Sequence, residues 1–278
     1  MSGPLNRDVT ASGVRLRVSE HGSGSPLVLL HGMFMDHSTW DGVVRVLSKS
    51  YRTVAPDLPG FGDSEKPPNS RYPYGVPAFA EAVADLYAGL ELGRCAVVGH
   101  ALGGAVALTL ASQHPELVSR LVLIDALCYP VPQVLRRRMV TSPVLGTLLF
   151  KQLMGKTAFR MLVRRSMLSS RSSSKDGFDH YYRVFNTPAA RGSALATMRS
   201  MLDTRALVAQ TSKVSAPTLV VWGRRDRLYP AGFGQRLSRE IRGAGFALLD
   251  AGHAPQEEQP DALAAVIENF LNDDRPPQ

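Results

Sequence analysis

The chain has little cysteine and no long hydrophobic run. Only two of its 278 residues are cysteine, Cys95 and Cys128, so we expect small buried side chains rather than a disulfide framework. The longest apolar stretches, PLVLLHGMFM and APTLVVWG, have the length of strands and are too short to span a bilayer. The start, MSGPLNRDVT, lacks a basic segment followed by an apolar one. These absences favour a cytoplasmic protein without a signal peptide.

Signals for metal or nucleotide cofactors are also missing. The seven histidines lack the spacing of metal ligands, and the two cysteines form no Cys/His cluster. No glycine-rich dinucleotide loop follows the first strand-like segment, and GHALGG is poorly spaced for one. We therefore expect any chemistry to proceed without a cofactor.

Positive charge is concentrated in one block. Residues 129–212 hold 14 Lys and Arg and three acids, a net charge of +11, whereas the whole chain carries +8 and the remainder therefore −3. Such a block is typical of a separate unit that meets an anionic partner, although a solvated helical surface explains it equally well. No aromatic–basic platform or DNA-binding motif accompanies the charge, which argues against a nucleic-acid partner.

Strand and helix patterns alternate in most of the chain. SPLVLL, RCAVVGH and VSRLVLIDAL indicate buried strands, and helical periodicity is clear over 77–92 and in LGGAVALTLASQHP. The alternation resumes after residue 213 with APTLVVWG, a helix, GFALLDAG and a last helix. This order predicts an α/β fold with a mostly parallel central sheet flanked by helices on both faces.

The alternation is interrupted once. Residues 129–212 show helical periodicity, a serine-rich stretch SSRSSSKDG and no convincing strand. We therefore expect an α/β core of residues 1–128 and 213–278, with an α-helical cap inserted at residues 129–212.

One turn has the setting of a catalytic nucleophile but not the side chain. In VVGHALGGAVAL a strand pattern passes through His100 into a helix, and the sharp turn falls on Ala101. The backbone N–H of Leu102 would stand at a helix N-terminus and face developing negative charge. A close approach of strand and helix explains Gly99 and Gly103. Alanine has no atom that can attack a substrate.

Three further loops extend this constellation. Asp226 follows the strand pattern VVWG, and His253 follows GFALLDAG. Alone, each would be interpreted as structural, but their order after the turn is that of a nucleophile, acid and histidine triad. In the loop HGMF, the N–H of Met33 is placed as a second oxyanion donor, and we expect His31 to shape the loop by hydrogen bonding to the backbone.

Together these motifs resemble the α/β-hydrolase fold superfamily, in its capped esterase and C–C hydrolase branch. The resemblance covers nearly the whole chain through HGMFMDHSTW, YRTVAPDLPGFGDSE, VVGHALGGAVAL, PTLVVWGRRDRLYP and GHAPQEEQP. It implies a triad acid at Asp226, a general base at His253, oxyanion donors at Met33 and Leu102, and a nucleophile position occupied by Ala101.

Substrate contacts are expected from Phe34, His100, Tyr181 and Tyr182. The ring of His100 is nevertheless expected to point away from the reacting centre. Tyr181 and Tyr182 also keep an epoxide hydrolase open as an alternative, because that branch has ring-opening tyrosines in its cap. The loop HGMF, however, lacks the proline that epoxide hydrolases have in their oxyanion loop.

The alanine leaves three interpretations open. In the favoured one, an engineered Ser-to-Ala change inactivates a serine hydrolase that cleaves an ester, thioester or C–C bond of a fairly apolar substrate. In the second, the alanine is natural, and His253 and Asp226 act as acid and base in a cyclisation, elimination or lyase step. In the third, the chain is a ligand-binding pseudoenzyme.

The cap is expected to select the substrate. Apolar side chains edged by basic ones suit an apolar acyl or polyketide-like substrate with an anionic end. They also suit delivery by an acidic carrier protein, or contact with an anionic membrane surface. The basic residues are Arg136, Arg137, Arg138, Lys151, Lys156, Arg160, Arg164 and Arg165. The oligomeric state is not predicted.

Overall fold

A computed structural model describes residues 5–130, 142, 145–148, 150, 155–166 and 175–273. Eight strands form one sheet in the order β1-β2-β4-β3-β5-β6-β7-β8. They are β1 (Leu5–Ala11), β2 (Val14–His21), β3 (Ser25–Leu30), β4 (Tyr51–Pro56), β5 (Cys95–His100), β6 (Val118–Ile124), β7 (Thr218–Gly223) and β8 (Gly245–Leu249). The pairs β1–β2 and β2–β4 are antiparallel, and all other neighbouring strands are parallel. The predicted mostly parallel sheet is confirmed.

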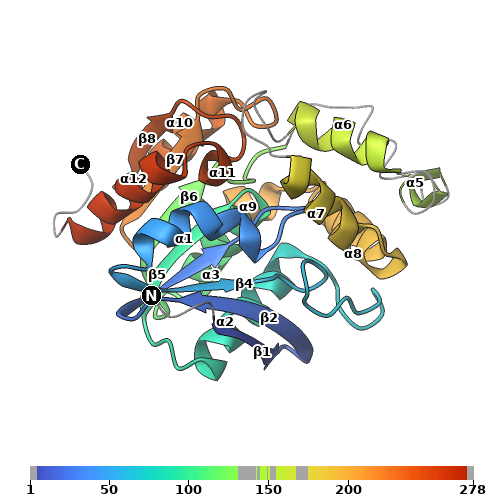
Figure 1. The fold of residues 1–278 in the computed structure, drawn as a ribbon. Helices are drawn as coiled ribbons and strands as arrows, with labels where there is room; N and C mark the ends of the chain where they lie inside the picture. The colour runs from blue at the N-terminus through green and yellow to red at the C-terminus, as the bar shows by residue number, and fades with distance from the viewer. Residues whose placement is uncertain are drawn as a thin grey trace.

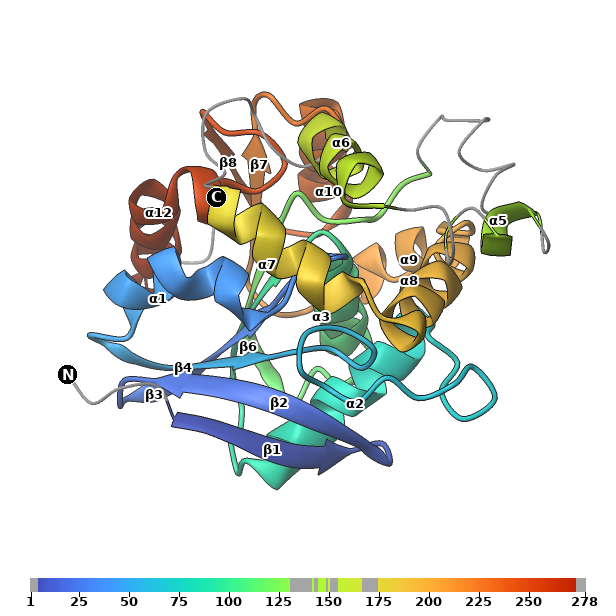
Figure 2. The same ribbon diagram turned by 45° about the vertical axis from the view of Figure 1, so that its right-hand side comes forward.

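Helices cover both faces of the sheet (Figures 1 and 2). One face is covered by α1 (Asp41–Leu47) and α12 (Pro260–Asn272). The other is covered by α2 (Val76–Gly89), α3 (Leu102–Gln113) and α10 (Ala231–Glu240). Each face has its own apolar core, so the central strands are buried on both sides and are apolar at nearly every position.

The described residues between β6 and β7 form helices and no strand. These helices are α5 (Leu145–Leu148), α6 (Lys156–Ser166), α7 (Lys175–Phe185), α8 (Pro188–Ser200), the short α9 (Arg205–Val208) and the 3-10 helix η3 (Thr211–Lys213). The predicted cap falls on this segment, and its boundaries at 129 and 212 remain a prediction. Of the basic residues expected at its edge, 136–138 and 151 lie outside the described residues.

Two short elements lie beside the strand ends that will form the site. The 3-10 helix η1 (His37–Trp40) follows β3, and α11 (Pro255–Glu258) follows β8. Cys95 and Cys128 are both buried and unpaired, as predicted. Among the described helices, none is both long enough and apolar enough to cross a membrane.

Strand β1 is the element that the sequence patterns do not reveal. Its side chains are mostly exposed, so it lacks a clear apolar alternation. It is joined to β2 by a two-residue turn in which Ser12 and Gly13 both have positive φ, 48° and 68°. Such a turn suits the twist of an antiparallel pair. The helix expected over 77–92 begins at Val76 and ends earlier, at Gly89.

Candidate active site

The turn between β5 and α3 holds Ala101 in a backbone conformation that L-residues rarely adopt, with φ 49° and ψ −106°. Such a conformation costs on the order of 1–3 kcal/mol and persists only when the surroundings impose it. Here the N–H of Ala101 donates to the carbonyl of Ile124 at 3.0 Å, and its own carbonyl accepts from the N–H of Leu127 at 3.0 Å. The strained turn therefore has the backbone geometry of a nucleophile elbow, although the methyl side chain of Ala101 cannot act as a nucleophile.

The two glycines beside the turn permit its close packing. A Cβ atom on Gly99 would lie 2.2 Å from the carbonyl oxygen of Gly103. A Cβ atom on Gly103 would lie 2.2 Å from the carbonyl oxygen of Leu30 in β3. These contacts confirm the predicted reason for both residues.

The loop after β3 lies against the turn. A Cβ atom on Gly32 would be 3.4 Å from the Cβ of Ala101 and 2.6 Å from Nδ1 of His100. His31 braces this loop: its Nε2 accepts the N–H of Leu58 at 2.9 Å, so Nδ1 carries the proton and donates to the carbonyl of Gly32 at 2.7 Å. Burial lowers the pKa of His31, which keeps the ring neutral. Its predicted loop-shaping role is confirmed.

Met33 and Leu102 supply the N–H groups predicted for an oxyanion hole. Leu102 is the first residue of the 12-residue α3, where N–H groups have no partner within the helix. Met33 follows Gly32 directly and is 9% exposed. Within the described part of the chain, neither N–H donates to another protein group. Their role as oxyanion donors remains a prediction.

The structure brings Asp226 and His253 together. Nδ1 of His253 lies 2.7 Å from Oδ2 of Asp226, and both side chains are buried. The other carboxylate oxygen accepts the N–H groups of Leu228 at 2.7 Å and Tyr229 at 3.0 Å. This arrangement fixes the proton of His253 on Nδ1 and leaves Nε2 able to accept a proton.

His100 holds the main chain of the histidine loop. Its Nε2 lies 2.6 Å from the carbonyl oxygen of His253, and because a carbonyl only accepts, this nitrogen carries the proton. Burial lowers the pKa of His100 well below its ordinary value, so the ring is neutral. The predicted substrate contact of His100 remains a prediction, and the contact present is with the backbone of His253.

Aromatic side chains from the segment between β6 and β7 pack against Phe34, in the loop after β3. The ring of Phe34, which has a φ of 65°, contacts Phe150, Phe159 and Phe185 at centroid distances of 6.2, 5.8 and 5.5 Å. Tyr182 joins this cluster 5.6 Å from Phe159. Phe34 and Tyr182 therefore belong to one aromatic cluster, which we call the aromatic lid. Their contact with an apolar substrate remains a prediction.

Two adjacent residues of α7 contact the elements after β3 and β8, and we call these two contacts the α7 latch. Nε2 of His180 lies 2.6 Å from Oδ2 of Asp36, and the hydroxyl of Tyr181 donates to Oε1 of Glu257 at 2.7 Å. Asp36 is three residues beyond Met33. Tyr181, expected at the substrate, thus directs its hydroxyl to a partly buried carboxylate.

The latch carries a charge-assisted contact. Burial alone would raise the pKa of Asp36, but hydrogen bonds from His180 and Ser38 outweigh it and lower this pKa to about 2. The hydrogen bond to Asp36 raises the pKa of His180. No sequence motif predicts this contact, because His180 and Asp36 are 144 positions apart.

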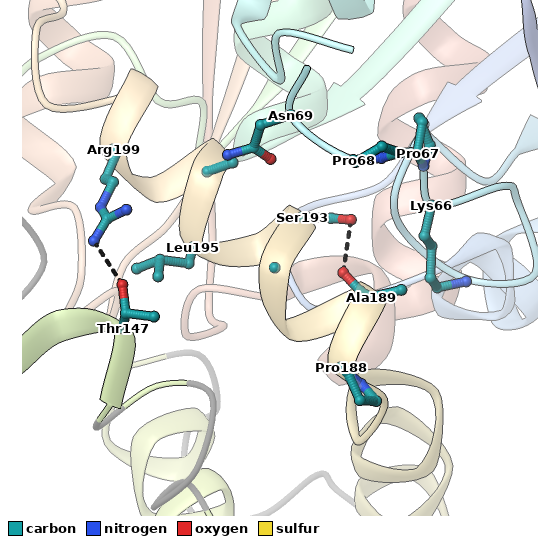
Figure 3. Close-up of a pocket in the computed structure, with 12 residues that line it drawn as sticks. Lys66, Pro67, Pro68, Asn69, Thr147, Pro188, Ala189, Ser193, Leu195 and Arg199 are labelled. Atoms are coloured by element: carbon teal, nitrogen blue, oxygen red, sulfur yellow. Dashed lines mark hydrogen bonds between the residues drawn. The ribbon is translucent and has the colours of Figure 1, made fainter. Parts of the chain in front are cut away.

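A pocket of about 440 Å³ lies between the loop after β4 and helix α8 (Figure 3). Its charged lining residues are Lys66 and Arg199, and no acid is among the described residues that line it. Lys66 donates to the carbonyls of Gly62 and Ser64 at 2.5 and 3.0 Å, and burial lowers its pKa. Lys66 also lines a small cavity together with Phe34 and Phe185, so the pocket adjoins the aromatic lid.

Two groups of side chains bring three metal-ligand atoms within 4.8 Å of one another among the described residues. They are Asp36, His37 and Asp57, and Asp125, Asp226 and His253. In each group a histidine nitrogen is already hydrogen-bonded to a carboxylate, at 2.8 Å for His37 with Asp57. Hydrogen bonding therefore accounts for both groups without an ion.

Comparison with known proteins identifies the family of the chain. Residues 27–266 match the model of the alpha/beta hydrolase family. The chain belongs to this family. It is 30% identical over 281 residues to the 2-hydroxymuconate semialdehyde hydrolase of Pseudomonas sp. strain CF600, covering 97% of this chain and 95% of that protein.

Two other relatives extend the range of named activities. The pimeloyl-acyl-carrier-protein methyl ester esterase of Aeromonas hydrophila subsp. hydrophila is 30% identical over 260 residues, covering 91% of this chain and 98% of that protein. The crystal structure of a bacterial membrane phospholipase A is 26% identical, with a TM-score of 0.80, covering 97% of this chain and 86% of that one. The chain is an α/β-hydrolase-fold protein, and the three relatives described above are named as hydrolases.

Proposed function

We propose that the chain has the catalytic framework of a serine hydrolase in which Ala101 takes the place of the nucleophile. The observation that carries this proposal is the strained backbone of Ala101, next to His100, whose ring holds the carbonyl of His253 in the buried Asp226–His253 pair. A serine at this position would lose its proton to Nε2 of His253 as its oxygen attacks the substrate carbonyl. The N–H groups of Met33 and Leu102 would then stabilise the oxyanion.

The alanine closes this route in the chain as it stands. Loss of the triad serine lowers the turnover of subtilisin about a millionfold, although binding and oxyanion stabilisation persist. The chain should therefore bind its substrate and form no acyl intermediate. We take the alanine to be an inactivating replacement of serine.

The substrate we propose has an apolar acyl part and an anionic end. The aromatic lid around Phe34 suits the apolar part. The pocket between Lys66 and Arg199 suits a carboxylate or a similar anion, since both of its charged residues are cationic. Relatives named as a semialdehyde hydrolase and a methyl ester esterase support both ester and C–C bond cleavage as candidate reactions.

The net positive charge of residues 129–212 favours an anionic partner as well as an anionic substrate. An acidic carrier protein is the partner we propose, and a relative named for an acyl-carrier-protein substrate supports it. Its binding should weaken with salt because charge complementarity would hold the complex together. An anionic membrane surface is the alternative partner, and vesicles that contain anionic lipid distinguish the two.

The experiment that tests the proposed function restores the hydroxyl. The variant Ala101→Ser should hydrolyse short and medium p-nitrophenyl esters, and Ala101→Ser with His253→Ala should not. Esters with a terminal carboxylate should lose about tenfold in kcat/KM when Lys66→Met or Arg199→Met is added, whereas neutral esters of equal length should not. An inert Ala101→Ser variant that is folded would refute the proposal.

Acid–base catalysis without a nucleophile is the second candidate, and Ala101 itself favours it. His253 and Asp226 are placed for proton transfer whether or not a serine is present. A cyclisation or elimination substrate would then react in the unmodified chain, and His253→Ala would stop that reaction. A ligand-binding pseudoenzyme would bind the same apolar anions and leave them unchanged.

A further inference from the structure

We propose that Asp125 is a second carboxyl group of the triad, a neutral acid that donates a hydrogen bond to Asp226 and can serve as the partner of His253 when Asp226 loses its charge. Asp125 is thus a positioning residue. The inference does not depend on the proposed substrate or on a nucleophile at position 101.

Asp125 is fixed in place by β7, the strand that leads to Asp226. It directly follows β6, and its N–H donates to the carbonyl of Val221 at 3.1 Å. Its Oδ1 accepts the N–H of Gly223 at 2.9 Å. Its φ is 43°, a left-handed conformation that is strained for a residue with a side chain. This backbone conformation directs the fully buried carboxyl group toward Asp226 and His253.

The side chains of Asp125, Asp226 and His253 each place an oxygen or nitrogen within 4.8 Å of the others. Glu258 is a further acid nearby, and its carboxylate accepts the N–H of Gly252. Within the described residues, no lysine or arginine pairs with either aspartate. At most one positive charge, that of a protonated His253, therefore faces two buried carboxyl groups. Two like charges at this distance cannot both be accommodated out of water.

The hydrogen bonds decide which carboxyl group holds the proton. Asp226 accepts hydrogen bonds from three donors, the N–H groups of Leu228 and Tyr229 and Nδ1 of His253. Asp125 accepts only from Gly223. Its Oδ2 is buried without a hydrogen-bond partner. If that oxygen carries a proton and donates it to Asp226, both carboxyl oxygens of Asp125 have a hydrogen-bond partner. Burial, together with the charge of Asp226, raises the pKa of Asp125 well above its ordinary value, in agreement with this assignment.

The assignment predicts how the site responds to loss of either carboxyl group. In Asp125→Asn the amide can accept from Gly223 and donate to Asp226, so the geometry is retained. In Asp226→Asn the like charge is gone, and Asp125 is able to ionise beside His253. The double variant then has neither aspartate carboxylate beside the imidazolium. A purely structural link between β6 and β7 would not distinguish Asp226→Asn from the double variant.

The experiment uses the chain with Ala101, labelled with 13C at aspartate carboxyl groups and 15N at histidine rings, and followed by NMR against pH. We expect one protonated aspartate carboxyl signal at neutral pH that is absent in Asp125→Asn. We also expect His253 to bind its second proton at least about tenfold more tightly in Asp226→Asn than in the double variant. Asp250→Asn, which removes an exposed carboxylate near the same loop, should change neither signal.

Two results would overturn the proposal. One is an ionised Asp125 signal at neutral pH in the unmodified chain, a measurement that needs no variant to fold. The other is equal proton binding by His253 in Asp226→Asn and in the double variant, with both shown to be folded by near-UV circular dichroism.

Discussion

The contact between His180 and Asp36 in the α7 latch should stabilise the cap only within a limited pH range. Asp36 has a pKa of about 2 in the fold against an ordinary value of 3.8, a difference equivalent to about 2 kcal/mol of folding free energy. Ser38 shares in lowering this pKa, and the side chain of His180 is 39% exposed. We therefore assign about 1 kcal/mol to the His180–Asp36 pair after allowing for solvent screening.

The sign of the pH dependence follows from the two pKa shifts. Because the pKa of Asp36 is lowered, its contribution is present above pH 3.8 and is lost as the pH falls toward about 2. Because the pKa of His180 is raised, its contribution is complete below pH 6.5 and is lost as the pH rises through the value in the fold. The pair should be strongest between these limits.

A double-mutant cycle measures this pair directly. Urea unfolding of the unmodified chain, His180→Gln, Asp36→Asn and the double variant should give a coupling of about 1 kcal/mol at about pH 5, which is smaller at about pH 9.5 because a neutral imidazole loses the charge but can keep the hydrogen bond. The exposed pair Lys156–Asp179 is the matched control within the cap, and its coupling should stay below about 0.5 kcal/mol. The reasoning fails if the His180–Asp36 coupling is zero at about pH 5 or is the same at both pH values.

Three further changes test separate contacts by urea unfolding. Tyr181→Phe removes the hydroxyl that donates to Glu257 and should destabilise the fold by about 1 kcal/mol; no change would mean that this half of the α7 latch contributes nothing. Gly103→Ala places a Cβ 2.2 Å from a backbone oxygen of β3 and should destabilise the fold by about 3 kcal/mol or more. Gly232→Ala, also in a helix but with open space around it, should stabilise the fold by about 0.5 kcal/mol. Similar results for the two variants would contradict the packing argument. In the unmodified chain, the free energy of unfolding should decrease above pH 3.8 by up to about 1.4 kcal/mol per pH unit, because a buried acid with a raised pKa holds its proton in the fold and releases it on unfolding. Asp125→Asn should abolish this decrease. An unchanged pH profile would count against a neutral Asp125.

The parts of the site that the sequence predicted are those encoded by local spacing. The turn at Ala101 and its neighbours Gly99 and Gly103 follow from a strand pattern that runs directly into a helix pattern. Asp226 and His253 each follow a strand, and because parallel strands end at one edge of a sheet, their order along the chain was enough to bring them together.

The parts that the sequence could not predict depend on distant partners. His180 and Asp36 are separated by 144 positions, and neither lies in a motif that names the other. The substrate contact expected of Tyr181 remains a prediction, whereas the bond from its hydroxyl to Glu257, 76 positions away, has no signal in the sequence. In the sequence Asp125 is only a residue at the end of a strand. Its position near Asp226 and His253 is seen only when β6 and β7 are placed side by side.

Covalent labelling tests the central claim, that position 101 is the nucleophile position of a serine hydrolase framework, most directly. A fluorophosphonate should modify Ala101→Ser at residue 101 in a one-to-one ratio by mass spectrometry, and should leave the unmodified chain unlabelled. Adding His253→Ala should slow the reaction about a thousandfold or more, because the base that activates the hydroxyl is gone. Absence of labelling in folded Ala101→Ser, or labelling that is equally fast without His253, would contradict the claim.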